Sequence, residues 1–142
     1  MAGHLPQRSG SLHPNIAPYG ETFSTADNQT IVLAVGNDKQ FKSLCESLGL
    51  PELANDPQFA RNPDRVKNRD NLAKRLAPVI RQMGHQHLSE VFADRGIPAG
   101  TLKNLESVFG SPETEQMVLK EELDDGTVSK RVRSVVFRLE SI

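Results

Sequence analysis

Residues 22–35 read TFSTADNQTIVLAV, a pattern typical of a β-hairpin. Thr22 to Ala26 form a short first strand, and the β-branched run Thr30 to Val35 forms the second. Asp27-Asn28 is the turn pair between them, because asparagine tolerates the positive φ that such turns require. The second strand is apolar on both faces, so we expect it to be central or covered.

A helix is predicted directly after this hairpin. Asn37 and Asp38 offer side-chain oxygens that can cap it, and Gly49 is a natural residue to follow its end. Four apolar residues at i, i+3, i+4 and i+7 define its buried face, and they are Phe41, Leu44, Cys45 and Leu48. Cys45 is therefore interpreted as a core side chain rather than a reactive thiol.

Further helical patterns follow a proline-rich region of loops and short turns at residues 50–63. One helix is expected from Asp64 to Met83, with a break near Leu76 because Pro78 lies inside it. A third helix ends at Gly96, residues 97–100 form a tight loop, and Thr101 caps a short helix. The expected core residues are Val66, Ala73, Leu76, Ile80, Met83, Leu88, Val91, Phe92, Leu102, Leu105, Val108 and Phe109. A last short helix is capped at Ser111, with Pro112 in its first position.

A second hairpin is predicted in the C-terminal part, around a two-residue turn at Asp125-Gly126. Its expected cross-strand pairs are Leu123 with Val128, Glu121 with Lys130, and Leu119 with Val132. The alternating residues that continue the strand are Val135, Phe137 and Leu139.

The predicted fold class is α+β: two β-hairpins forming a small antiparallel sheet packed with three to four helices, preceded by an extended linker. Residues 1–20 are the linker, because they are rich in proline and glycine and follow no regular period. Residues 21–142 are the domain.

Composition excludes several classes of function. With 17 basic and 18 acidic side chains the net charge is −1, which does not favour nucleic acid or an anionic membrane as partner. The longest apolar run, residues 31–35, is far shorter than the ~20 residues that cross a bilayer. A single cysteine excludes an internal disulfide and a multi-cysteine zinc site, so we expect a reducing, cytoplasmic setting.

The sequence contains only weak signals for a catalytic or metal-binding site. His85 and His87 point apart on a helix, so we expect surface histidines and no metal site. The basic run 130–133 could contact a phosphate; the alternative is a solvated strand paired with the acidic side chains of residues 121–125. No nucleophile and base can be paired by spacing, so no catalytic residue is expected in this chain.

The order of motifs is more specific. It opens with Arg8-x-Gly10-x-x-His13-Pro14-x-x-x-Pro18-Tyr19 and Phe23-x-Thr25-Ala26-Asp27. The motifs that follow are residues 31–41, residues 48–53, residues 56–59, Arg65-Val66-x-Asn68-Arg69, residues 96–100, and Val108-Phe109-x-x-Pro112-Glu113. Together they resemble the small domain of the family III CoA-transferases, the superfamily that includes carnitine dehydratase-like proteins and formyl-CoA transferase. Ala99 and Thr101 depart from it, since members often have cysteine and proline there.

This resemblance implies a partner for the chain. Family members join this small domain to a Rossmann-like large domain, and two chains interlock as a dimer. The large domain supplies the coenzyme A site and an aspartate that attacks an acyl-CoA thioester, and no position here matches that aspartate. The implied function is that of a small-domain fragment that binds no cofactor alone, with coenzyme A thioester as substrate of the complete enzyme. Its partner is then the large domain or a second copy of itself.

Candidate substrate contacts also come from the resemblance, in which a glycine-containing segment near the start of this domain approaches the active site. That segment matches residues 10–14 here, and the residues expected near the substrate are Gly10, Ser11, His13 and Tyr19. The alternative is that they only fix the linker path. Residues 36–38 favour the transferase members over the racemase members. A second hypothesis is an inactive stand-alone binding or dimerisation module that retains the fold.

Overall fold

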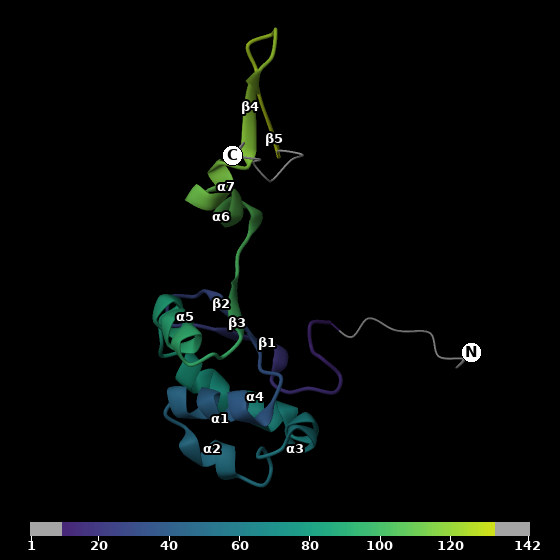
Figure 1. Cartoon of the computed structure of the whole chain (residues 1–142), viewed down its shortest axis with the longest axis vertical. Helices are drawn as coiled ribbons and strands as arrows, with labels where there is room; N and C mark the ends of the chain where they lie inside the picture. The colour runs from purple at the N-terminus through teal and green to yellow at the C-terminus, as the bar shows by residue number, and fades with distance from the viewer. Residues whose placement is uncertain (1–9, 133–142) are drawn as a thin grey trace, which may run out of the picture. The chain divides into compact units, whose positions relative to one another are not determined.

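The computed structural model describes residues 10–132, which belong to two compact units, residues 1–102 and 103–142 (Figure 1). Unit 1 contains β1 (Tyr19–Ser24), β2 (Thr30–Ala34), α1 (Asp38–Ser47), α2 (Pro51–Asn55), α3 (Asn62–Lys67), α4 (Arg69–Ile80), α5 (His85–Asp94) and β3 (Ala99–Leu102). Unit 2 contains α6 (Leu105–Phe109), α7 (Pro112–Glu115), β4 (Val118–Glu122) and β5 (Val128–Val132). The predicted α+β class is confirmed, and within the described residues the strands form two separate antiparallel sheets.

The first hairpin is present as predicted. β1 and β2 pair antiparallel, with Thr22 opposite Val32 and Ser24 opposite Thr30. Asn28 adopts a φ of 57°, the left-handed conformation that the turn requires. β1 begins at Tyr19, three residues before the predicted start, because Tyr19 already pairs with Ala34 across an irregularity in the ladder.

A third strand, β3, pairs with the other edge of β2, so the sheet order is β1-β2-β3. The predicted loop over residues 97–100 and the helix capped by Thr101 are therefore wrong. Thr101 lies opposite Ile31, and the Ala34 N–H donates to the Pro98 carbonyl at 2.9 Å. β2 is apolar on both faces, so it lies in the middle of the sheet and its backbone needs a hydrogen-bonding partner on each edge. The sequence of the short segment 99–102 does not by itself indicate that it is this partner.

In unit 1 the predicted helices are present, with differences around residue 68 and at α2, which lies in the region predicted to be loops and short turns. In α1 the Asn37 side chain accepts the Gln40 N–H at 2.9 Å, and Phe41, Leu44 and Cys45 are buried as predicted. The predicted long helix breaks at Asn68 rather than near Leu76, while Pro78 lies inside α4. The break changes the phase of the apolar face, so Leu72 is buried where Val66 was expected, and Val66 is half-buried.

The core of unit 1 lies between the sheet and the helices, where α4 contacts β1 and α5 contacts β3 (Figure 1). It is formed by Phe23, Ile31, Leu33, Val35, Phe41, Leu44, Cys45, Leu48, Leu53, Phe59, Leu72, Leu76, Ile80, Leu88, Phe92 and Ile97. One charged side chain, that of Arg65, is as completely buried as these apolar residues.

Unit 2 contains the predicted second hairpin, but its register differs by one residue. The turn spans three residues, with Gly126 at a φ of 80° and the Leu123 N–H bonded to the Thr127 carbonyl at 2.8 Å. Lys130 consequently lies opposite Lys120 rather than Glu121. The predicted pairs were wrong because the glycine allows a longer turn than two residues. The predicted continuation at residues 135–139 lies outside the described residues.

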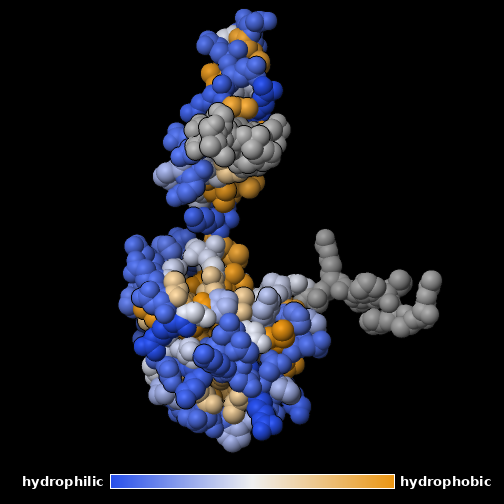
Figure 2. Space-filling view, viewed as in Figure 1, coloured by the Kyte–Doolittle hydropathy of each residue, from blue (hydrophilic) through white to orange (hydrophobic). Residues whose placement is uncertain are grey.

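Helix α6 does not bury the side chains expected of it. It begins after Asn104, whose side chain accepts the Ser107 N–H at 2.7 Å, and not after Thr101. Leu105 is 74% exposed and Phe109 is 49% exposed. Hydrophobic side chains are visible on the surface of unit 2 among hydrophilic ones (Figure 2). The predicted cap and proline of α7 are confirmed in position, with Pro112 in its first turn.

The thiol of Cys45 should be chemically silent in the folded chain. Burial raises the pKa of Cys45 to about 12, outweighing the opposite effect of the nearby Arg65 charge. Since the thiolate is the reacting form, a disulfide reagent at pH 8 should label no Cys45 in buffer and one thiol per chain in 6 M guanidinium chloride. Labelling of the native chain at the rate of the denatured one would contradict this placement.

Candidate functional site

The residues predicted to lie near the substrate belong to one folded segment, residues 10–21, here called the N-terminal loop. The Ser11 hydroxyl donates to the Gly20 carbonyl at 2.9 Å, and the His13 N–H donates to the Tyr19 carbonyl at 2.9 Å. The His13 and Tyr19 rings meet edge to face, with centroids 5.4 Å apart. The structure therefore brings Ser11, His13 and Tyr19 together, with Gly10 at the start of the loop.

The loop folds back on itself, so the extended path predicted for this segment is not found in its described part. Residues 10–18 form a series of turns. Glycine is required at position 20, where the end of the loop meets its beginning. Gly20 has a φ of 89°, and an added Cβ would lie 1.8 Å from the Ser11 carbonyl oxygen. The Val35 N–H donates to the Pro18 carbonyl at 3.0 Å and joins the loop to the strand β2.

Arg69, at the start of α4, binds the loop through its carbonyl groups. One guanidinium nitrogen, Nη2, donates to the His13 carbonyl at 2.5 Å and to the Ile16 carbonyl at 2.9 Å. The other, Nη1, donates to Glu21 Oε1 at 2.8 Å. The Arg69 side chain is 15% exposed and that of Glu21 is 7% exposed, so the pair is mostly shielded from water. A cavity of about 200 Å³ adjoins the pair beneath Leu12.

Arg65, four residues earlier, holds the next part of the loop from inside the core. Its Nε donates to the Ala17 carbonyl at 2.7 Å, and its Nη1 donates to the Phe59 carbonyl at 2.9 Å. Nη2 donates to Asp38 Oδ1 at 2.6 Å. The guanidinium carbon lies 4.4 Å from the centre of the Phe41 ring. This fully buried cation is thus neutralised by one carboxylate and surrounded by acceptors.

Asn62, at the start of α3, completes the set of side chains that hold the loop. Its Nδ2 donates to the Asn15 carbonyl at 2.7 Å, and its Oδ1 accepts the Ala17 N–H at 3.1 Å. Sequence reasoning had assigned no role to Asn62, Arg65 or Arg69. A signal was present, because neither arginine has an aspartate or glutamate three or four positions away, the spacing of intrahelical ion pairs.

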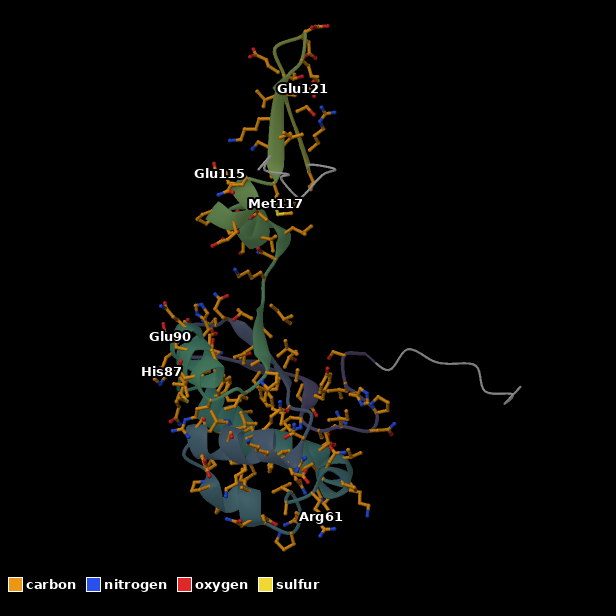
Figure 3. All side chains as sticks on the ribbon, in the orientation of Figure 1. Arg61, His87, Glu90, Glu115, Met117 and Glu121 are labelled. Atoms are coloured by element: carbon orange, nitrogen blue, oxygen red, sulfur yellow. The ribbon has the colours of Figure 1, made fainter. Side chains whose placement is uncertain are left out.

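The two histidines considered for metal binding, His85 and His87, have different surroundings. Asp27 accepts the His85 backbone N–H at 3.1 Å, and its second oxygen contacts His85 Nδ1. His87 is exposed on the outer side of α5 (Figure 3). Within residues 10–132, histidine, cysteine, aspartate and glutamate side chains form no group of three that could hold a metal ion.

The basic run in unit 2 is only partly paired with acidic side chains. Arg131 forms an ion pair with Glu121 at 2.9 Å, whereas Lys130 lies opposite Lys120. Both lysines line a cavity of about 510 Å³ together with Phe109, Val118 and Val132. The predicted Glu121–Lys130 pairing is therefore wrong, and Arg133 lies outside the described residues.

The sequence profile of CoA-transferase family III matches residues 1–141, nearly the whole chain. The chain belongs to this family. Several curated relatives are named as CoA-transferases. Succinate–glutarate CoA-transferase of Agrobacterium fabrum is 34% identical over 138 residues, which are 96% of this chain and 34% of that protein. Human succinyl-CoA:glutarate CoA-transferase is also 34% identical, over 124 residues, and acetyl-CoA:oxalate CoA-transferase of Acetobacter aceti is 37% identical over 112 residues.

Solved structures agree with the family assignment. The crystal structure of a CAIB/BAIF family protein from Brucella suis has a TM-score of 0.77 and 34% identity, and the match covers 95% of this chain and 38% of that one. The chain spans about a third of the length of the curated relatives it matches. In the part of the chain that the structure describes, each helix is too short or too polar to cross a membrane.

Replacing Arg65 tests whether its buried guanidinium holds the fold together. Arg65→Leu leaves the buried carbonyls of Ala17 and Phe59 without this donor, so the free energy of unfolding should fall by about 3 kcal/mol, measured by urea denaturation. Arg75→Ala is the matched control, because Arg75 pairs with Glu52 at 3.6 Å on the surface and should change stability by less than about 0.5 kcal/mol. Equal effects of the two substitutions would refute a structural role for Arg65.

Asp27 should make the stability of unit 1 depend on pH in the acid range. The hydrogen bonds from His85 and then Thr25 hold the pKa of Asp27 well below its ordinary value. A carboxyl group with a depressed folded-state pKa contributes stability above its unfolded pKa of about 4 and loses it as the pH falls toward the folded value. The difference in melting temperature between the native chain and Asp27→Asn should therefore be larger at pH 7 than at pH 2.5. Asp94→Asn, at the other end of α5, is the control, and a difference that grows in acid would contradict the assignment.

Proposed function

We propose that this chain is the small domain of a CoA-transferase that moves coenzyme A between an acyl-CoA and a carboxylic acid. The observation that carries this proposal is the family III match over residues 1–141. The named relatives act on succinate, glutarate and oxalate, so a short dicarboxylic acid is the favoured acyl group. The matches cover about a third of each curated relative, which supports a division of labour with a large domain.

The chemistry assigned to the large domain is a covalent transfer by an aspartate. Its carboxylate attacks the acyl-CoA carbonyl, the thiolate of coenzyme A leaves, and a mixed anhydride remains. The same thiolate then attacks the aspartyl carbonyl, which releases the first acid and leaves an aspartyl thioester. The second acid repeats these two steps in reverse and departs as the product thioester. Each step exchanges one acyl bond for another, with no net oxidation and no metal required.

The contribution of this chain is the N-terminal loop, with Gly10, Ser11, His13 and Tyr19 near the substrate. Tyr19 is 38% exposed, and Ser11, whose hydroxyl donates to the Gly20 carbonyl, is also exposed. Arg65, Arg69 and Asn62 fix the loop by its backbone, which leaves these side chains available. A loop whose conformation is set before binding loses little entropy when the substrate arrives.

An inactive binding or dimerisation module is the second candidate. The observation that favours it is the exposed apolar surface of unit 2, where Leu105 and Phe109 are 74% and 49% exposed. Under the first proposal this surface contacts a large domain or a second copy in the assembled dimer. A cytoplasmic location fits both candidates, because a chain with a single cysteine forms no internal disulfide.

A transfer assay separates the two candidates. Residues 1–142 alone, given succinyl-CoA and glutarate, should show no turnover, and the assembly of this chain with its large domain should form glutaryl-CoA. The product is measured by liquid chromatography. Turnover by residues 1–142 alone would overturn the division of labour. An assembly that binds coenzyme A but transfers none from succinyl-CoA or acetyl-CoA to glutarate or oxalate would support the inactive module.

A further inference from the structure

We propose that His13 contacts the substrate as a neutral hydrogen-bond donor through Nε2–H, and that Arg69 is the positioning residue that holds it. The ligand atom is a carboxylate oxygen of the dicarboxylic acid, and for the identity of that ligand the inference rests on the proposed function. The state of the histidine ring and the role of Arg69 rest on the geometry of the N-terminal loop alone.

The protonation state of the ring follows from its neighbour in the chain. The Asn15 backbone N–H donates to His13 Nδ1 at 3.2 Å. A nitrogen that accepts a hydrogen bond carries no proton, so the single proton of the neutral ring lies on Nε2. Among residues 10–132 no acceptor bonds to that Nε2–H, and the side chain is half-buried. The loop therefore presents one donor of fixed identity.

The position of His13 is fixed by bonds to both of its backbone groups. Its N–H is bonded to the Tyr19 carbonyl, and its carbonyl accepts from Arg69 Nη2, which also binds the Ile16 carbonyl. Ile16 follows Asn15 directly, so one guanidinium nitrogen holds the backbone on both sides of the N–H that selects the ring tautomer. Loss of Arg69 should free this turn and release the ring from a single tautomer.

A neutral hydrogen-bond donor is suited to a transferase, whose site binds a charged carboxylic acid and an uncharged thioester in turn. Arg69 is neutralised by Glu21 at 2.8 Å, so this part of the loop carries no net positive charge. A neutral N–H can donate to a charged carboxylate oxygen and also to an uncharged thioester carbonyl. An ion pair would instead favour the acid strongly over the thioester.

Nuclear magnetic resonance of nitrogen-15-labelled histidine tests the tautomer directly, in the enzyme assembled from this chain and its large domain. The His13 signals are identified by their loss in His13→Gln. We expect an unprotonated Nδ1 and a protonated Nε2 in the neutral ring, and a shift of the Nε2 proton on adding glutarate. A proton on Nδ1, or rapid exchange between the two forms in the unmodified enzyme, overturns the proposal.

Arg69 and Arg81 form a matched pair for the positioning role. Arg81 also binds a backbone carbonyl, that of Thr25 at 2.9 Å, but outside the N-terminal loop. Arg69→Ala and the milder Arg69→Lys should bring the His13 ring into exchange between tautomers, whereas Arg81→Ala should leave it fixed. A single Nε2–H tautomer in folded Arg69→Lys and Arg69→Ala refutes the role of Arg69.

Kinetics test the contact itself. Removing a hydrogen bond to a charged oxygen in His13→Leu should raise the KM for glutarate about tenfold or more, with kcat changed less than about threefold. His13→Gln retains an N–H donor and should recover most of this loss, and Arg81→Ala should match the unmodified enzyme. An unchanged KM in His13→Leu refutes the contact. Absence of all transfer activity would reject the proposed function instead, and the tautomer measurement would still decide the geometry.

Discussion

The buried guanidinium group of Arg65 is the interaction on which the rest of unit 1 depends. An unpaired charge in a protein interior is costly, so this group is tolerated only where acceptors surround it. The carbonyls of Ala17 and Phe59 and the Asp38 carboxylate supply them, from three separate parts of the chain. Because one planar group must satisfy all of them at once, the N-terminal loop, the turn before α3 and the start of α1 are fixed relative to one another.

We expect the two arginines to have different roles, although they are only four residues apart: Arg65 stabilises the fold, and Arg69 positions the N-terminal loop. Arg65 is fully buried and hydrogen-bonded to several parts of the chain, so its loss should lower the stability of the whole of unit 1. Arg69 is 15% exposed, and it binds the loop beside the residues proposed to meet the substrate. The break at Asn68 places these arginines on successive helices, so the loop is held by both α3 and α4.

A loop fixed by its backbone is a suitable place for substrate contacts in a domain for which we propose that a partner supplies the nucleophile. Several of its carbonyls are bound by arginine and asparagine side chains, which leaves the Nε2–H of His13 available. Such a loop supplies shape and directed hydrogen bonds, and the covalent steps belong to a partner domain in our proposal. The exposed apolar side chains of unit 2 fit the same proposal, because they offer apolar surface that a partner domain would cover.

The sequence by itself determined the features that depend on neighbours in the chain: the hairpin with its turn at Asn28 and the buried face of α1 with Cys45. Periodicity and turn chemistry report such local features because they act over a few residues. Only the tertiary structure decided the pairing of β3 with β2, the register that sets Lys130 opposite Lys120, and the binding of the loop by Arg65 and Arg69. These join residues as far apart in the chain as Thr30 and Leu102, and an unpaired strand edge or a buried cation finds its partner only when the chain has folded.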